Sequence, residues 1–347
     1  EQTQSVFASV EVGWKSMLYL TLTGRNDWAS QLANSSTPCF FYPSVGLSGV
    51  ISEMLTLPEF IDYMKVRGSF SSVGMPYPRN LTSPTYEYDE ANQQWKPKTH
   101  YPIKDLKPER TNSWELGLDM RLFKDFSLGF SWYLANTFNQ TFDPKVSVSS
   151  GYSKIYLQTG YVRNSGVELS LGYGHTWNNH LHWESNFTLS HNKNTIKDLV
   201  TSYIHPETGL PITQNRLDVG GLGKARFILK KGGTLGDLYT QSDLKRDNSG
   251  MVEIDPSGAL TTEDNLPDIK LGSVFPKANL AWNNRFEWRG VSLSALFTAR
   301  IGGIAYSATQ AAMDQYGVSE RSAQARDNGG VLLNGRTLVD AVSYTHL

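Results

Sequence analysis

Two short motifs bring reactive residue types together, but each lacks the companions that its chemistry needs. His180 and His182 lie two residues apart, yet no carboxylate or cysteine is placed to complete a metal-binding set. Gly220–Ala225 resembles a phosphate-binding loop. However, Asp218 stands where that motif has its first glycine, and Ala225 replaces the Ser or Thr that binds the metal. Neither motif predicts a metal site or a nucleotide cofactor.

A third motif, from Ser242 to Lys245, has the Ser-x-x-Lys spacing of some acyl enzymes. It lacks the companion motifs of those enzymes, so we read the spacing as chance. The single cysteine, Cys39, excludes a disulfide within the chain and a cysteine-rich zinc site. The sequence therefore predicts no catalytic residue, no metal site and no cofactor, and we expect a protein that is not an enzyme.

Binding chemistry is suggested by aromatic residues in one aperiodic segment. Aromatic faces stack on sugar rings, so a substrate platform is one interpretation of this segment. Packing within the loop, or contact with a partner protein, is the commoner role of loop aromatics, and we favour it. The candidate substrate-binding residues are Tyr86, Tyr88, Trp95 and Tyr101.

Composition narrows the class of protein. The net charge is −1, and no basic cluster with interleaved aromatics suggests nucleic-acid binding. Charged residues make up 19%, below the roughly 25% of a typical soluble domain, while aromatics reach 12%. No apolar run approaches the roughly 18 residues of a membrane helix. Because the first residue is Glu1, we expect an internal piece of a longer protein.

The segment 111–141 predicts one long hairpin. Every second residue from Trp114 to Leu122 is apolar, and the residues between them are small or charged. The return arm repeats this pattern from Phe126 to Leu134, after a two-residue turn at Lys124–Asp125. Each arm is longer than the roughly 9–11 residues that a tilted strand needs to cross a bilayer, whereas soluble strands average about 5–6. The hairpin is therefore typical of a transmembrane β-barrel.

Similar alternation recurs along the chain and predicts about ten strands. The predicted strands alternate between short and long connections, which in up-and-down order places all short turns at one end. Aromatics, among them Trp14, Trp177 and Trp288, gather at the short-turn end and predict an interfacial girdle. The predicted fold class is all-β: a transmembrane antiparallel up-and-down β-barrel, of which this chain supplies about ten strands.

Several runs, in this order and spacing, resemble the SusC/RagA-like TonB-linked outer-membrane transporters. The resemblance extends from about Gly13 to Gly303. The matching runs are Leu20–Trp28, Phe41–Val45, Lys65–Phe70, Val73–Gly74, Leu106–Thr111, Trp114–Gly117, Asn164–Leu169 and Phe275–Lys277, the last with Asn283–Asn284 and Phe286.

The resemblance implies a plugged barrel of roughly 22 strands in the Gram-negative outer membrane. It also implies import of oligosaccharides or peptides with a SusD-like surface lipoprotein as lid, driven by the TonB complex. The amino-terminal plug and the TonB-contacting segment of such transporters are not recognised in this sequence. We therefore expect TonB to contact a part of the protein outside this chain.

The expected organisation assigns residues 1–303 to barrel strands. Within this range the large loops are expected at about 74–110, 142–163 and 194–272, on the extracellular side. Residues 304–341 are expected to form a further extracellular loop region. The last residues, 342–347, resemble the translation of a sequencing adapter, and we hypothesise that they are not native.

One segment departs from the pattern of many such transporters, which carry a calcium-loop-like run here. The corresponding segment is Asp255–Asp264. A calcium loop needs oxygen ligands at alternating positions around a central glycine, and Ala259 and Pro256 break that pattern. We therefore predict no calcium site.

Two other functions are compatible with the sequence. The chain could belong to another TonB-dependent receptor or to a passive barrel channel, which a plug domain and a neighbouring SusD-like gene would distinguish. It could also be a soluble secreted all-β glycan-binding module, because strands of a β-sandwich alternate as well. Strand length, the pairing of short and long connections, and charges beside Gly and Ser on the non-apolar face favour the barrel.

Overall fold

The computed structural model describes the chain except for residues 1, 34, 36, 78–80, 82–85, 98–99, 102–105, 143–153, 159, 178–179, 205–210, 257–259, 334–335 and 339–347. Also outside the description are the side chains of residues 86–87, 96–97, 100–101, 142, 154–155, 157, 200–204, 211–214, 333, 336 and 338. Two units are distinguished. The first comprises Glu1–Val219, Leu229–Leu235 and Pro276–Gly302, and the second comprises Gly220–Ile228, Gly236–Phe275 and Gly303–Leu347.

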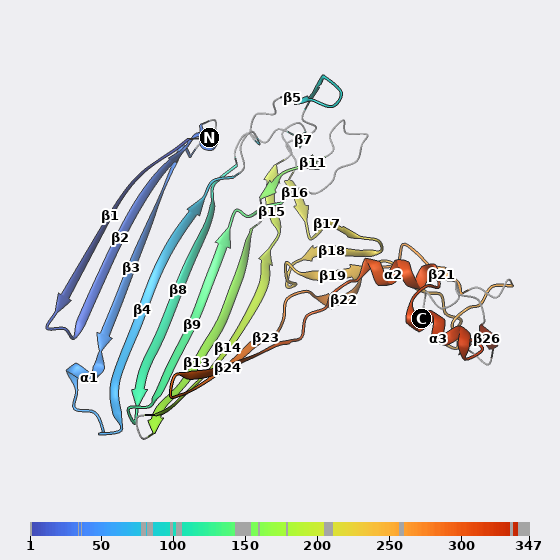
Figure 1. Ribbon diagram of the computed structural model, residues 1–347. Coiled ribbons are helices and arrows are strands. Elements are labelled where there is room, and N and C mark those ends of the chain that lie inside the picture. Colours follow the sequence, from blue (N-terminus) through green and yellow to red (C-terminus); the bar gives the residue numbers. More distant parts are fainter. Residues whose placement is uncertain are drawn as a thin grey trace. The chain divides into compact units, whose positions relative to one another are not determined.

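The first unit is built on one ten-stranded sheet in which every neighbouring pair is antiparallel (Figure 1). Its order is β1-β2-β3-β4-β8-β9-β13-β14-β23-β24, so strands that follow one another along the sheet also follow one another along the chain. The predicted all-β, antiparallel up-and-down architecture is thereby confirmed. The strands are β1 Thr3–Trp14, β2 Leu18–Ala29, β3 Cys39–Val50, β4 Ile61–Met75, β8 Glu109–Leu122, β9 Phe126–Phe138, β13 Tyr161–Trp177, β14 Leu181–Asp198, β23 Ala278–Trp288 and β24 Val291–Ile301.

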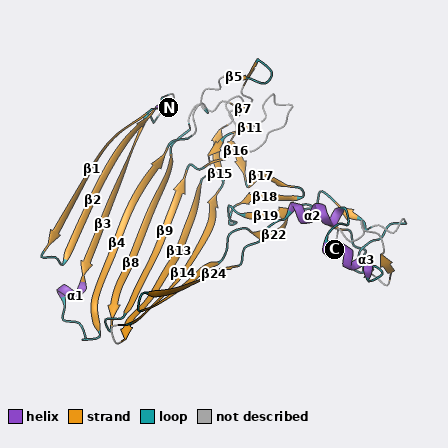
Figure 2. Ribbon diagram, in the orientation of Figure 1, coloured by secondary structure: helices purple, strands orange, loops and turns teal. Residues whose placement is uncertain are grey.

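Connections alternate along the sheet in the expected way (Figure 2). Residues 15–17, 123–125, 178–180 and 289–290 form the tight links, while 76–108, 139–160 and 199–277 form the long ones. The β3–β4 link, residues 51–60, carries a short helix, α1 Ile51–Met54. A 3₁₀ turn, η1 Ser30–Leu32, follows β2.

The turn between β8 and β9 differs from its prediction. It contains three residues rather than two, because Phe123 leaves the strand and adopts a positive φ of 52°, as Lys124 does at 64°. The Phe123 ring then stacks on Phe60, with ring centroids 5.6 Å apart. This stacking explains why the alternation ends one residue before the predicted turn.

Some sheet strands reach into segments that were expected to be loops. β14 continues to Asp198, past the expected loop start at 194, and β13 begins at Tyr161 rather than after 163. Polar residues such as Asn192 and Asn194 hide the alternation there, but each pairs in register with the first residues of β13. By contrast, β23 begins only at Ala278, several residues after the expected loop end at 272.

The two faces of the sheet differ in character. On one face, register aligns Val66, Leu118, Phe130, Leu169 and Leu189 across five neighbouring strands. Many large apolar side chains of this face are exposed, for example Leu116 at 56% and Phe297 at 59%. Within the described residues no second sheet packs on this face. The other face is polar.

The buried cores of the first unit lie at the long-loop ends of the strands rather than over the middle of the sheet. One cluster holds Ala29, Leu32, Tyr77, Leu81 and Leu106. The second holds Val162, Ile196, Leu199, Leu217 and Leu229. The strands are therefore held by main-chain pairing and same-face contacts along most of their length.

Shorter strands fill the long connections and the second unit. β18, β19 and β22 pair antiparallel in that order, and the buried Asp237 of β19 bonds Lys270 of β22 at 2.6 Å. Their bounds, with those of the other short strands, are β5 Tyr86–Asp89, β6 Gln94–Pro97, β7 His100–Tyr101, β10 Thr141–Phe142, β11 Lys154–Ile155, β12 Leu157–Gln158, β15 Val200–Ile204, β16 Pro211–Gln214, β17 Arg216–Leu222, β18 Ala225–Lys230, β19 Asp237–Thr240, β20 Asp243–Leu244, β21 Thr262–Glu263, β22 Ile269–Ser273, β25 Val331–Leu333 and β26 Arg336–Leu338.

The segment 304–341, which was expected to form a loop region, contains two short helices. They are α2 Ala308–Gln315 and α3 Glu320–Asp327, and the side chains of Ser307 and Ser319 cap their N-termini. The Asp314 carboxylate accepts a bond from Arg321 at 2.6 Å and so links the two helices. Among the described residues, no helix has the length and apolarity to cross a membrane.

Candidate functional site: the polar face of the sheet

The polar face of the sheet carries a row of side chains that runs across the strands. Register places Arg67 of β4 opposite Gly117, and continues the row through Ser131, Glu168, Ser190 and Asn279 to Arg300 of β24. Alternation puts these positions on one face, because side chains two apart on a strand point the same way. The row therefore brings residues from seven strands to one surface.

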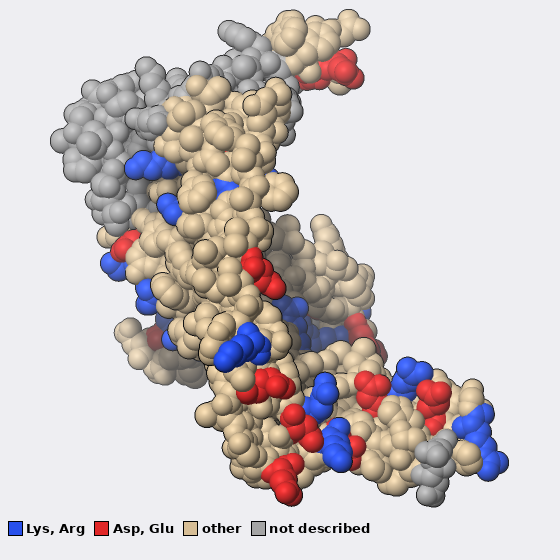
Figure 3. Space-filling model, turned by 90° about the vertical axis from the view of Figure 1, so that its left-hand side faces the viewer, with Lys and Arg blue, Asp and Glu red and all other residues tan. Residues whose placement is uncertain are grey.

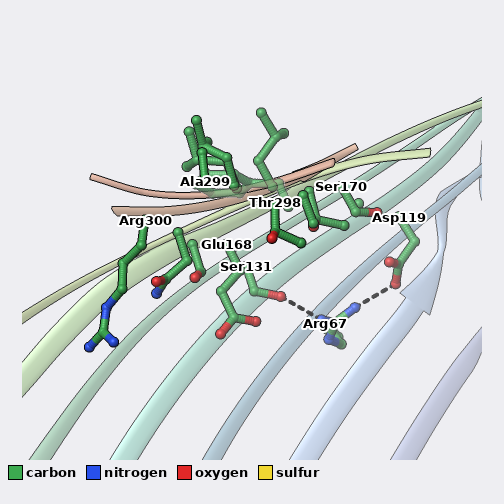
Figure 4. Close-up of a pocket in the computed structure, with 17 residues that line it drawn as sticks. Arg67, Asp119, Ser131, Glu168, Ser170, Thr298, Ala299 and Arg300 are labelled. Carbon is green, nitrogen blue, oxygen red and sulfur yellow. Dashed lines mark hydrogen bonds and ion pairs between the residues drawn. The ribbon is translucent and has the colours of Figure 1, made fainter. Parts of the chain in front are cut away.

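Arg67 is the centre of a charged network on this face. Its guanidinium donates to the Asp119 carboxylate at 2.6 Å and to the Ser131 hydroxyl at 2.6 Å, as Figure 4 shows. A longer contact reaches Glu115 at 3.3 Å. One side chain from β4 thus links its neighbour β8 with β9, the next strand of the sheet.

Gly117 makes this arrangement sterically feasible. The Arg67 side chain passes over Gly117 on its way to β9, and a Cβ at that position would lie 2.5–2.8 Å from three Arg67 side-chain atoms. No side chain at residue 117 could share this space while Arg67 keeps its partners. The glycine and the arginine therefore form a matched pair on neighbouring strands.

A cavity of about 650 Å³ lies over this face. Its polar lining includes the hydroxyl groups of Ser131, Ser170 and Thr298, together with the charged side chains of Arg67, Asp119, Glu168 and Arg300 (Figure 4). Within the part of the chain that the structure describes, the Glu168 carboxylate makes no hydrogen bond or ion pair. The lining can thus hydrogen-bond a polar solute or a polar protein segment, and it presents a carboxylate that is open to a cationic group.

The network contributes modestly to stability. The side chains of Arg67, Glu115 and Asp119 are 36%, 45% and 43% exposed, so water screens their attraction. Ion pairs of this exposure are worth about 0–1 kcal/mol each. The chemistry on this face is therefore that of a hydrated, hydrogen-bonding wall.

The close fit of Arg67 over Gly117 gives a first prediction. Gly117→Ala should lower the unfolding free energy of the full-length protein by about 1 kcal/mol, because the methyl group displaces the guanidinium from its partners. The same change should cost clearly less in an Arg67→Ala background, where nothing occupies that space. Denaturant unfolding of the four variants in lipid vesicles measures this coupling, and equal costs in both backgrounds would contradict it.

The predicted substrate-binding aromatics are brought together only in part. Tyr88 of β5 and Trp95 of β6 are cross-strand partners in a short hairpin, with ring centroids 5.1 Å apart and planes inclined by 58°. Their side chains are 45% and 66% exposed. The Asp89 carboxylate closes the hairpin by accepting the backbone N–H of Ala91 at 3.0 Å.

The other two predicted aromatics cannot be assessed in the same way. Tyr86 lies on β5 and Tyr101 on β7, but their side chains are outside the described residues. Tyr77, another aromatic of this segment, is only 4% exposed and packs in the core cluster with Leu106. The segment thus contains both a packing aromatic and an exposed aromatic pair.

No described group of three or more His, Cys, Asp or Glu side chains could hold a metal ion. In the segment that was compared with a calcium loop, residues 257–259 are outside the description. Asp264 binds Lys224 at 2.7 Å and Ser242 at 2.5 Å, and the hydrogen bond from Lys224 lowers the pKa of this carboxyl group. The absence of a calcium site stays a prediction. His182 bonds Thr176 at 2.9 Å.

Comparison with known families identifies the fold. The family described as "TonB dependent receptor-like, beta-barrel" matches residues 1–262. The chain belongs to this family. It is a family of outer-membrane transporters rather than of enzymes, and the predicted resemblance is confirmed at the level of the family and its barrel fold.

Individual members of the TonB-dependent receptor family share only low sequence identity with this chain. TonB-dependent receptors P39 and P26 of Formosa agariphila are each 24% identical, over 271 and 331 residues. These alignments cover 75% and 88% of this chain but 23% and 32% of the relatives, so the chain spans about a quarter to a third of their length. The structure of the RagAB peptide transporter has a TM-score of 0.70 at 19% identity, covering 92% of this chain and 35% of that one.

The Arg67 network was not recognised as a unit from the sequence. Alternation placed Arg67 and Glu115 on the polar parity of their own strands, but not against each other. Their contact depends on pairing β4 with β8 across residues 76–108. No local pattern in the sequence indicates that Arg67 and Gly117 lie opposite each other.

Proposed function

We propose that this chain forms part of the barrel of a TonB-dependent importer in the Gram-negative outer membrane. The proposal rests on one observation: this member of the TonB-dependent receptor family has a sheet with one apolar face and one polar face. Its exposed apolar face suits hydrocarbon, and its polar face, with Arg67 and Glu168, suits a hydrated lumen. Residues 304–341 and the three long connections would then lie on the extracellular side.

The edges of the sheet support a larger barrel. β1 and β24 are its outermost strands, and both are exposed along their whole length. In lipid, unpaired backbone groups on two edges would each cost several kcal/mol. We therefore infer that further strands of the full-length protein pair with β1 and β24 and close the barrel.

For the cargo and the partner, we propose import of oligosaccharides or peptides together with a SusD-like surface lipoprotein. Support comes from the likeness in fold to a structure described as a peptide transporter, and from the sequence resemblance to SusC/RagA-like transporters. TonB would engage a part of the protein outside this chain. We propose no catalytic step and no cofactor.

Uptake by the full-length receptor in its native host tests the proposal. The receptor should fractionate with the outer membrane, and its deletion should abolish growth on one class of oligosaccharide or peptide. Deletion of TonB should abolish the same growth, whereas a passive channel would be unaffected by the loss of TonB. Recovery of the receptor in the soluble secreted fraction would refute the proposal.

The aromatic hairpin supplies a prediction about the cargo. If Tyr88 and Trp95 contact it, Trp95→Ala should weaken binding roughly 2- to 10-fold, because an aromatic contact is worth about 0.5–1.5 kcal/mol. Trp95→Phe should retain most of the affinity. Gln94→Ala, on the same strand but the opposite parity, is the matched control. Calorimetry on the complete transporter measures the affinities, and unchanged affinity in Trp95→Ala would exclude a role for this residue.

A further inference from the structure

An apolar groove lies on the exposed apolar face, beside the turn between β8 and β9. Its volume is about 420 Å³, within the roughly 300–1,000 Å³ of small-molecule sites. Its apolar walls are formed by Leu122, Phe126, Leu128, Leu171, Tyr173 and Phe187.

The groove arises from one small side chain among large ones. Register aligns Phe126, Tyr173 and Ser185 across three strands, and the neighbours of Ser185 on the same face of β14 are Trp183 and Phe187. The small Ser185 side chain leaves a notch between these larger side chains. The Ser185 hydroxyl accepts a hydrogen bond from the Trp282 indole at 2.9 Å, which fixes that ring beside the notch. The side chains around the notch are therefore held in place without filling it.

A continuous series of aromatic contacts indicates where the groove lies relative to the bilayer. It runs from Phe60 through Phe123, Phe126, Tyr173 and Trp183 to Phe286, with successive ring centroids 4.7–6.4 Å apart. Such aromatic girdles lie at the headgroup level of a bilayer. An occupant would therefore have a polar end at the turn and an apolar end toward the hydrocarbon.

The turn offers a cation to that polar end. Lys124 follows Phe123, and within the described residues its ammonium group has no carboxylate partner. Two acids at this turn have other partners: Asp62 accepts the backbone N–H of Lys124 at 2.6 Å, and Asp125 bonds His175 at 2.7 Å. An ammonium group at headgroup depth complements a phosphate.

We propose that this groove binds one acyl chain of a membrane glycerophospholipid, with the lipid phosphate at the ammonium group of Lys124. The inference rests on the proposed function, because it requires the apolar face to contact the bilayer. It goes beyond general lipid contact in assigning one retained lipid to one groove. The groove belongs to the periplasmic leaflet, where the short turns of such barrels lie.

Native mass spectrometry of the full-length receptor tests the assignment after extensive detergent exchange. The wild type should retain one phospholipid per barrel. Leu171→Trp, which fills the groove, and Lys124→Ala, which removes the cation, should each reduce retention at least about 5-fold. Lys15→Ala is the matched control, because Lys15 also lies in a short turn with a positive φ of 49° but stands over Trp14, outside the groove.

The outcomes separate this proposal from the proposed function. Equal retention in wild type, Leu171→Trp and Lys124→Ala would overturn the lipid site, as would an equal loss in Lys15→Ala. Retention of lipopolysaccharide alone would overturn it too. In each of these cases the receptor would still fractionate with the outer membrane. A wild-type receptor absent from that membrane would instead refute the proposed function.

Discussion

Leu169→Arg should reduce the unfolding free energy of the full-length receptor by about 2–4 kcal/mol, the cost of arginine near the bilayer midplane on the lipid face of a barrel. Leu169 lies near the middle of β13, in the apolar row with Phe130 and Leu189. A guanidinium there would displace hydrocarbon contact and would have no water to solvate it. The effect follows directly from the assignment of the two faces.

Ser170→Arg provides the matched control. Ser170 is the next residue of the same strand, is exposed, and lines the cavity on the polar face. The same arginine there should change stability by less than about 0.5 kcal/mol, as at other exposed sites. Urea unfolding in phospholipid vesicles measures both variants. Equal costs for the two substitutions would contradict the assignment of a lipid face and a lumen face, and a larger cost at Ser170 would mean that the two faces are reversed.

Gly166→Ala should destabilise the receptor by about 1–3 kcal/mol, the range for forcing extra volume into a packed site. A Cβ at Gly166 would overlap the backbone carbonyl of His191 on β14 and the Tyr133 hydroxyl on β9. Tyr133 can turn aside, but a backbone carbonyl in the ladder cannot move without disturbing the pairing of β13 with β14. The cost should therefore persist in a Tyr133→Ala background, which removes the ring and leaves the His191 carbonyl in place.

Gly174→Ala is the control for this prediction, since Gly174 lies on the same strand and a Cβ there would meet nothing within 4 Å. That change should be neutral or stabilising by a few tenths of a kcal/mol, because alanine restricts the unfolded chain. The measurement is again denaturant unfolding in vesicles. If Gly166→Ala and Gly174→Ala change the unfolding free energy equally, the close approach at Gly166 does not contribute to stability.

The strands themselves could be predicted because their signal is local. Alternation from Trp114 to Leu122 and from Phe126 to Leu134 placed β8 and β9, and the same pattern placed the other eight strands of the sheet. Strand ends were less accurate where polar residues such as Asn192 and Asn194 continue a strand beyond its apolar part. The helices α2 and α3 were not predicted, because eight-residue helices with little apolar periodicity have no strong sequence signal.

The sequence by itself determined which side chains share a face of each strand, since side-chain direction alternates with a period of two residues whatever the strand pairs with. Only the tertiary structure decided which strands meet and in what register. Register set Arg67 over Gly117 and left Ser185 as a notch between Trp183 and Phe187. Both sites depend on the approach of residues tens of positions apart in the chain, and no local pattern encodes that approach.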